Sequence, residues 1–402
     1  MFKVQTMNRE EKAFLANIAT ILVKDLGIDK KFHPKRVPNI LSTETCCDED
    51  GLELFINQIH KKIQRKRILK KRLKTKVIFT LNKMLKLPLN FVNEGLQHGP
   101  IMSKDTYEKL FSELKQYIPN NIKYENMHVL QRSIFNCGLT LLLQKKENLI
   151  NILKKYEVDE IFFHKVAPYF YNNIVKDFST YVKWPETLDK KMKVLKEFCN
   201  VEEHKKLNVF GVINSKIIDV NFKEDSNKNK SFVIQITCDA NQVISNVEVE
   251  YADSYSFPDT KIGRILLNDS ANDFIPDNSY FVGSSGLPIS EKLITPFRKI
   301  NDEKEEKFNS ILDDYINISA KMFKLIFNRF QILRNLNFEN PAHFKNILKS
   351  ICIVHNLCLK NDDYFDAEIR NEESCFKPYE SCDNEGDLDG LDKRKELLNV
   401  IF

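Results

Sequence analysis

The spacing of apolar residues divides the chain into a helical first half and a second half in which strands alternate with helices. Residues 8–26 carry apolar positions three and four apart, which predicts an amphipathic helix. The pattern is helical again, and very basic, from residue 51 to about residue 85. Residues 101–182 predict a run of helices joined by short polar breaks, and we expect residues 125–144 to form one of them.

Two helices in this run resemble a helix-turn-helix pair. The first ends before a turn at residues 156–158, and Asp159 is placed to cap the second. Ser103 holds the same kind of capping position before an earlier helix. An ordinary helical hairpin has the same pattern, so both interpretations stay open.

After residue 205 the apolar period changes from helical to extended. Three strands are predicted as an antiparallel meander, followed by a short helix, two more extended segments and two long helices. This order is that of a ribonuclease H-like fold, a mixed α/β sheet with helices on its faces. The strands are expected at residues 208–222, 231–240, 244–253, 279–283 and 292–297.

The same changes of pattern predict four parts. Residues 1–100 form a helical, basic region of unknown role, and residues 101–200 form a helical domain that contains the helix-turn-helix-like segment. Residues 205–360 form the ribonuclease H-like domain. Residues 361–402 form an acidic C-terminal tail, and we interpret residues 362–392 as loop-like.

Charge is distributed unevenly, although the formal net charge is only +5. Ten of the sixteen residues from 61 to 76 are Lys or Arg, which indicates a nucleic-acid partner, a nuclear-localisation signal or both. A solvated helix face is the alternative interpretation. The candidate nucleic-acid-binding residues are Lys61, Lys62, Arg65, Lys66, Arg67, Lys70, Lys71 and Arg72.

The cysteines and the lengths of the apolar runs indicate in which cellular compartment the protein is found. The nine cysteines are scattered without a framework pattern, which favours reduced thiols. No run of 18 apolar residues predicts a membrane span, and the first residues lack the apolar core of a signal peptide. We therefore expect a protein of the nucleus, and also of the cytoplasm, without a membrane partner.

Four stretches of the second half occur in the order and spacing of one family. They read GVINSKII, SFVIQITCDANQVISNVEV, FVGSSGLPISEKLITPFR, and RFQIL followed by CIVHNLCL. On these motifs, residues from about 208 to 359 resemble the transposase-derived nuclease domain of the PIF/Harbinger superfamily, a DDE-type endonuclease. The helical segment before them, which includes VKWP, is similar to the helix-turn-helix region that precedes the nuclease domain in that family.

The resemblance implies a catalytic site built from acidic residues, but most of those positions are neutral in this chain. The family cleaves phosphodiester bonds with Mg²⁺ or Mn²⁺ held by carboxylates on two strands and a helix. Asn214, Ser284 and Ala320 occupy three of the family's acidic positions, while Asp259 keeps a fourth. Asp259 is thus the one candidate metal ligand, no residue is assigned as catalytic, and no cofactor is expected.

The missing charge decides how we interpret Ser284. Two unit charges about 4 Å apart interact by about 4 kcal/mol at an effective dielectric constant of ~20, and neutral side chains supply none of this. Ser284 is best interpreted as the relic of a metal-binding aspartate, since no histidine lies near it in sequence to activate it as a nucleophile. Asp219, Asp253 and Asp313 are placed poorly to substitute.

Cys352, His355 and Cys358 recur every three residues within the HNLCL hallmark of the family. Metal ligation would need a fourth ligand from elsewhere, so helix packing is the favoured interpretation.

These features together predict a domesticated, catalytically inactive, transposase-derived nuclear protein. It would act by binding DNA or chromatin proteins, as a scaffold or transcriptional cofactor. In the family, the nuclease works with a separate Myb/SANT-like DNA-binding protein, so the resemblance implies such a partner. The alternatives are an active metal-dependent DNA endonuclease and a purely protein-binding adaptor.

Overall fold

The structure is a computed structural model in which the chain divides into two compact units, Met1–Pro88 and Leu89–Phe402. All described residues lie in the second unit. They are residues 102–402 apart from 125–126, 157, 200–206, 223–228, 268–273, 335, 339, 365–376 and 380–386. The helix predicted at residues 8–26 and the basic segment at 61–76 therefore lie outside the described residues.

The described chain begins with a helical region. Ser103 caps its first helix by accepting a hydrogen bond from the Thr106 N–H, and Asp159 caps a later one by accepting from the Phe162 N–H, as the sequence predicts. The helices are α6 (Lys104–Leu114), α7 (Gln131–Leu143), α8 (Lys146–Lys155), α9 (Glu160–Ile174), the 3-10 helix η3 (Val175–Asp177), α10 (Phe178–Tyr181) and α11 (Leu188–Phe198).

One prediction for this region is wrong, because residues 125–144 are not a continuous helix. Met127–Leu130 forms strand β2, which pairs antiparallel with β1 (Asn121–Tyr124). Ile122 and Val129 are partners in this hairpin and both are buried. Tertiary packing of this apolar pair overrides a local pattern that favours helix.

The second region is built around one long strand, β3 (Val209–Phe222). The order in the main sheet is β5-β4-β3-β6-β7. β4 and β5 continue the sheet antiparallel from β3, whereas β6 pairs parallel with β3 and β7 with β6. Two short strands, β8 and β9, also pair with β3. The remaining strands are β4 (Asn229–Cys238), β5 (Ile244–Tyr251), β6 (Tyr280–Gly283), β7 (Leu293–Ile294), β8 (Asn337–Phe338) and β9 (Lys377–Pro378).

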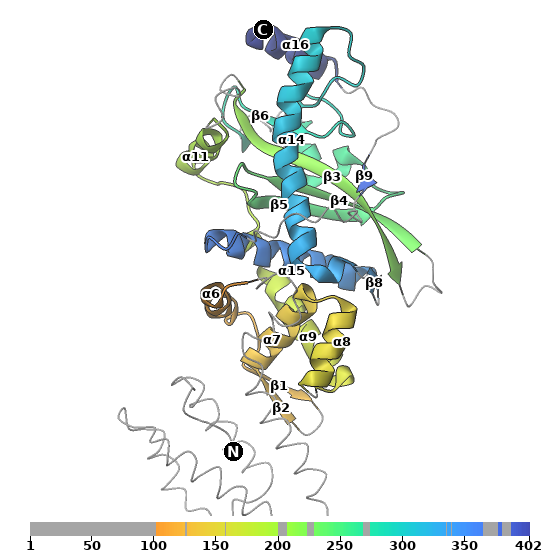
Figure 1. Ribbon diagram of the computed structural model, residues 1–402. Coiled ribbons are helices and arrows are strands. Elements are labelled where there is room, and N and C mark those ends of the chain that lie inside the picture. The colour runs from red at the N-terminus through yellow and green to blue at the C-terminus, as the bar shows by residue number, and fades with distance from the viewer. Residues whose placement is uncertain are drawn as a thin grey trace, which may run out of the picture. The chain divides into compact units, whose positions relative to one another are not determined.

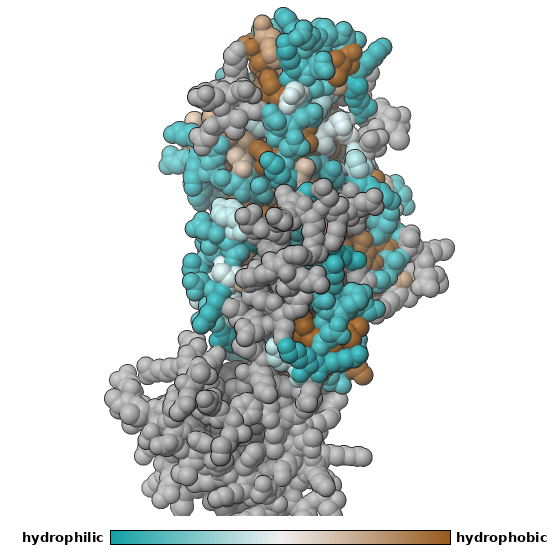
Figure 2. All heavy atoms as spheres, viewed as in Figure 1, coloured by the Kyte–Doolittle hydropathy of each residue, from teal (hydrophilic) through white to brown (hydrophobic). Residues whose placement is uncertain are grey.

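Helices cover both faces of this sheet, as predicted for a mixed α/β fold. Figure 1 shows α14 (Glu303–Arg329) crossing one face, and α15 (Pro341–Lys360) contacts β5. The other face packs against α11, the 3-10 helix η5 (Phe257–Asp259) and α12 (Lys261–Leu266) in an apolar cluster that includes Ile213 and Phe281. The outer side of α14 is polar, and the face seen in Figure 2 carries only small, separate apolar patches.

The HNLCL segment of α15 has a packing role, as the sequence favours. His355 Nε2 lies 3.0 Å from the Gln242 carbonyl oxygen in the turn between β4 and β5. Burial lowers the pKa of His355 to about 4 and raises those of Cys352 and Cys358 to about 12 and about 11. Both thiols are buried in the core, which fits a role in helix packing.

Asn356 fastens the same helix to the sheet. Its Oδ1 accepts the Ile244 N–H (2.9 Å), and its Nδ2 donates to the carbonyl oxygens of Ile244 (2.7 Å) and Tyr181 (2.9 Å). One buried amide thus joins α15, β5 and the helical region.

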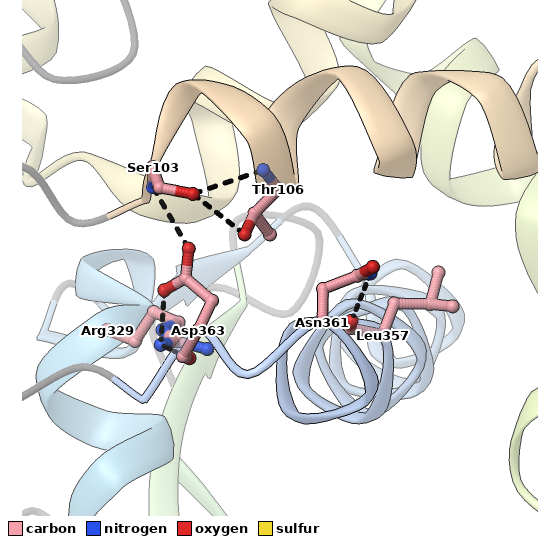
Figure 3. A network of polar contacts seen from close by, with 6 residues as sticks. All are labelled: Ser103, Thr106, Arg329, Leu357, Asn361 and Asp363. Carbon is pink, nitrogen blue, oxygen red and sulfur yellow. Dashed lines mark hydrogen bonds and ion pairs between the residues drawn. The ribbon is translucent and has the colours of Figure 1, made fainter.

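A second buried connection starts from Arg329, the arginine of RFQIL. Its guanidinium donates to the backbone and the carboxylate of Asp363, and the other carboxylate oxygen accepts the Ser103 N–H (2.9 Å; Figure 3). Arg329 is fully buried. A buried cation needs such a partner, so this network holds α14, the end of α15 and the start of α6 together.

Part of the acidic tail is helical, which corrects the prediction of loop for residues 362–392. Leu388–Ile401 forms helix α16, capped by Asp387, with Leu397 and Leu398 buried. Gly390 permits its close approach, because a Cβ at this position would lie 2.6 Å from the Ser290 Cα. The apolar pair near the end of the chain outweighs the acidic composition of the segment.

Among the described residues, no helix is both long and apolar enough to cross a bilayer.

The Asn356 connection predicts a large mutational effect. Asn356→Ala should lower the free energy of unfolding by about 3 kcal/mol, because it leaves buried backbone groups without partners. Asn346→Ala on the same helix removes an exposed hydrogen bond to Asn172 and should cost less than about 1 kcal/mol. Chemical denaturation of both variants measures the difference, and equal losses would contradict the role of Asn356.

The turn between β4 and β5 predicts a pH-dependent effect. Asp239 accepts the N–H groups of Asn241 and Val243, yet burial raises its pKa to about 6. A raised pKa means that the folded state binds this proton more tightly, so ionisation costs stability as the pH rises through about 6. Asp239→Asn keeps both hydrogen bonds and should add about 1–2 kcal/mol at pH 7.

Unfolding curves of the wild type and Asp239→Asn at several pH values provide the measurement. The gain should disappear below the ordinary pKa of 3.8, where the carboxyl is protonated in both states. A gain that does not change with pH would refute the titration of Asp239 as its cause.

Candidate functional site

Asn214 lies in the middle of β3, on the face of the sheet that α14 covers. Its partner on β4 is Ile236, and its side chain is 1% exposed. Because side chains alternate along a strand, Asn214 shares its face with Val212 and Lys216, whereas Ile213 points into the opposite cluster.

Ser319 of α14 is the hydrogen-bond partner of Asn214. Asn214 Nδ2 donates to Ser319 Oγ at 2.9 Å, and this hydroxyl donates its single proton to the Ile316 carbonyl oxygen at 2.6 Å. The hydroxyl can then only accept from Asn214, which fixes the orientation of the amide. Ser319 is 0% exposed, so the contact excludes water.

Ser284 follows β6 at the adjoining position of the same sheet. Ile213 pairs with Gly283, and the Ser284 N–H donates to the Ile213 carbonyl oxygen at 3.1 Å, which brings Ser284 beside Asn214. Ser284 Oγ and Asn214 Oδ1 are both buried, and neither has a hydrogen-bond partner among the described residues. Among the described residues no base contacts the serine hydroxyl, so no group is placed to activate it as a nucleophile.

The helix residue at this junction is Ser319, one position before the predicted Ala320. The buried stripe of α14 runs through Leu312, Tyr315, Ser319 and Met322, while Ala320 is only half-buried. One residue turns a helix by about 100°, so counting from a distant motif does not fix which side chain faces the sheet.

Asp259 does not join these residues. It is exposed in η5, between Phe257 and Ile262, and both of those neighbours pack in the cluster on the Ile213 side of the sheet. Its backbone carbonyl accepts the Arg264 guanidinium. The candidate metal ligand is therefore separated by the sheet from Asn214.

The other acidic residues considered as substitutes lie elsewhere. Asp253 and Asp313 are exposed. Asp219 pairs with Lys377 Nζ at 2.7 Å, and the hydrogen bond from that lysine lowers the pKa of the Asp219 carboxyl. None of the three contacts Asn214 or Ser319 in the part of the chain described.

The junction of β3, β6 and α14 does not fit a divalent ion. Mg²⁺ needs several hard oxygen ligands, usually with carboxylate charge, and the side chains here offer one amide and hydroxyls. Within residues 102–402, gaps excepted, no group of three His, Cys, Asp or Glu is arranged to hold a metal. Neutral side chains also explain why the junction can be buried, since carboxylates there would need a cation or water.

The helix-turn-helix-like segment consists of α8 and α9, joined by a short turn. Phe163 of α9 is buried, while Ile161, His164, Lys165 and Tyr169 point outward. Ile161 is 63% exposed, so the outer face mixes apolar and basic groups.

A cavity of about 530 Å³ adjoins these helices. Its lining is mainly apolar, and Tyr171 OH and His343 Nε2 lie 2.9 Å apart within it. Among its described lining residues Glu160 is the one carboxylate, and no group of three His, Cys, Asp or Glu in the described part of the chain is arranged to hold a metal.

Comparison with protein families gives a match to part of the chain. Residues 220–356, about a third of the chain, match the family described as DDE superfamily endonuclease. The match supports a transposase-derived nuclease domain; it begins after Asn214 and includes Ser284 and Ser319. No curated protein and no solved structure matches the chain.

The contact between Asn214 and Ser319 predicts that α14 is sensitive at one position and tolerant at the next. Ser319→Asp buries a carboxylate without a cation and should cost more than about 2 kcal/mol at pH 8, with a smaller loss at pH 4. Ala320→Asp, half-buried on the neighbouring side, should cost less than about 1 kcal/mol. Denaturation of both variants at the two pH values tests this, and a reversed order would place Ala320 at the junction.

Proposed function

We propose that this chain is a domesticated, catalytically inactive protein derived from a Harbinger-type transposase, and that it acts in the nucleus by binding DNA, chromatin proteins or both. The observation that carries this proposal is the neutral, buried contact between Asn214 and Ser319 beside Ser284. A two-metal nuclease needs negative charge at these positions to bind its ions and to activate water.

The order of the strands supports the finer assignment of the fold. An antiparallel meander of β3, β4 and β5, with β6 and β7 added parallel on the other side of β3, is the arrangement expected of a ribonuclease H-like sheet. In such a sheet, the junction of β3 and β6 is where the resemblance places two of the family's acids. The fold is retained in this proposal while the chemistry is lost.

The binding role rests on the sequence. The run of cations from residue 61 to 76 would contact DNA phosphates or direct nuclear entry. The outer face of α9 includes the apolar Ile161, which does not suit contact with phosphates. We therefore assign DNA contact to residues 61–76 and not to α9. A Myb/SANT-like protein is the partner that the family resemblance suggests.

Plasmid cleavage separates the inactive protein from its rival, an active endonuclease. Purified full-length chain with Mg²⁺ or Mn²⁺ should nick supercoiled plasmid no faster than Asp259→Ala, and neither metal should raise the melting temperature. An ion present at about 100 times its dissociation constant would add about 2.7 kcal/mol of stability. Metal-dependent cleavage that Asp259→Ala abolishes would refute inactivity.

DNA binding by the basic run has a defined salt dependence. Each phosphate contact contributes about −0.9 to the slope of log K against log salt concentration. The variant Lys66→Glu/Arg67→Glu/Lys70→Glu/Lys71→Glu should therefore bind duplex DNA more weakly and, if all four residues contact phosphates, with a slope shallower by about 3.6. Fluorescence anisotropy at several salt concentrations measures both quantities. An unchanged slope would favour the protein-binding adaptor.

A further inference from the structure

The cavity beside α8 and α9 has walls from both regions of the described chain. These two helices contribute most of its lining, and α15, β8 and the 3-10 helix η6 (Gln331–Arg334) contribute on the side of the sheet. Its volume of about 530 Å³ lies within the range of about 300–1,000 Å³ that is usual for ligand sites. The buried apolar residues that form its floor are Leu149, Leu153, Ile332, Phe338 and Ile347.

The cavity is a groove that opens to solvent along α9. Ile161 lines it and is 63% exposed, and two further lining residues of this helix, His164 and Lys165, are exposed as well. On the side of α8, the lining residue Lys146 is exposed, whereas Leu149 is buried. An exposed apolar side chain at the edge of an apolar floor is typical of a surface that binds another molecule.

Contacts between α9 and α15 hold the groove in shape. The rings of Tyr171 and His343 stack with their centroids 5.3 Å apart, in addition to the contact between Tyr171 OH and His343 Nε2. The Phe338 ring meets the His343 ring edge-on at 5.8 Å. Because packed rings fix these walls, a partner would bind without first having to order them.

The rim of the groove favours negative charge. Lys146 and Lys165 are exposed there, while Glu160, the one carboxylate among the described lining residues, lies 3.9 Å from His164 Nε2. The first turns of three helices also border the groove: Lys146 begins α8, Glu160 begins α9, and His343 is the third residue of α15. Since helix N-termini carry partial positive charge, they add to the attraction of the lysines for an acidic partner.

The apolar floor and the cationic rim together select the class of partner. A DNA strand would bring phosphates to the rim, but it would leave the floor and the exposed Ile161 without apolar contacts. An amphipathic helix that carries acidic residues beside its apolar stripe suits both. The lining extends over residues 146–153 of α8 and 160–171 of α9, about 10 Å and about 16 Å at 1.5 Å per residue, which matches two or three turns of such a helix.

We propose that the groove formed by α8, α9 and the start of α15 docks an acidic amphipathic helix of a partner protein. Only the identification of that partner as a chromatin protein rests on the proposed function. The groove itself requires neither a neutral metal site nor DNA binding by residues 61–76.

A display library of random peptides of about 16 residues, or about four helical turns, provides the probe. Peptides selected on the full-length chain should carry apolar residues at positions i, i+3 or i+4, and i+7, with Asp or Glu beside them. Ile161→Glu should weaken their binding about tenfold, because a charge replaces an apolar contact at the edge of the groove. Met192→Glu, which changes an exposed apolar residue of α11 outside the described lining, is the matched control and should leave the dissociation constant unchanged.

Reversal of the rim charge tests the electrostatic part of the proposal. Fluorescence anisotropy should show that Lys146→Glu/Lys165→Glu binds a selected acidic peptide about tenfold more weakly, and binds the same peptide with Lys at each acidic position more tightly. Lys190→Glu/Lys196→Glu on α11 changes the net charge equally and should do neither. A variant that unfolds would lose both peptides, so the exchange of preference reports on charge alone.

Failure to select any peptide, or selected peptides that bind Ile161→Glu as tightly as the parent, would overturn the groove as a docking site. It would equally be overturned if duplex DNA displaced the peptides and bound Lys146→Glu/Lys165→Glu, but not Ile161→Glu, more weakly than the parent. Metal-dependent cleavage of plasmid would instead overturn the proposed inactivity and leave the groove standing. The two claims therefore fail by different results.

Discussion

A charge cannot stay buried between a sheet and a helix without a partner, and this constraint governs the centre of the molecule. Asn214 and Ser319 meet where β3 faces α14, both almost fully excluded from water. Carboxylates at these places would repel one another unless a cation or water separated them. Neutral side chains allow α14 to close directly onto the sheet. The missing charge and the tight packing of this junction therefore go together.

The buried polar groups that hold the fold together have hydrogen-bond partners, whereas Asn214 Oδ1 and Ser284 Oγ at the site have none among the described residues. Arg329 is buried but paired with Asp363, and Asn356 satisfies three backbone groups. These residues belong to the RFQIL and HNLCL motifs on which the family resemblance rests. These motif residues therefore have structural roles in this fold that do not depend on a metal site.

The sequence predicted correctly those features that depend on residues close together in the chain. Ser103 and Asp159 cap their helices through their own side chains, and the strand periods of β3 to β5 follow from alternation. Contacts between distant residues escaped prediction: the hairpin of β1 and β2 depends on the pairing of Ile122 with Val129, and α16 depends on its contact with Ser290. Counting from RFQIL selects Ala320, whereas Ser319 is the residue that contacts Asn214. The rotation of a helix is set by its packing, and the buried stripe of α14 carried that signal.

The most direct test of the neutral site is anomalous diffraction from crystals of the full-length protein soaked in manganese. Our account predicts no ordered ion where β3, β6 and α14 meet. An anomalous peak coordinated by Asn214, Ser284 and Ser319 would contradict it, and the chain would then have to be treated as a metal-dependent nuclease.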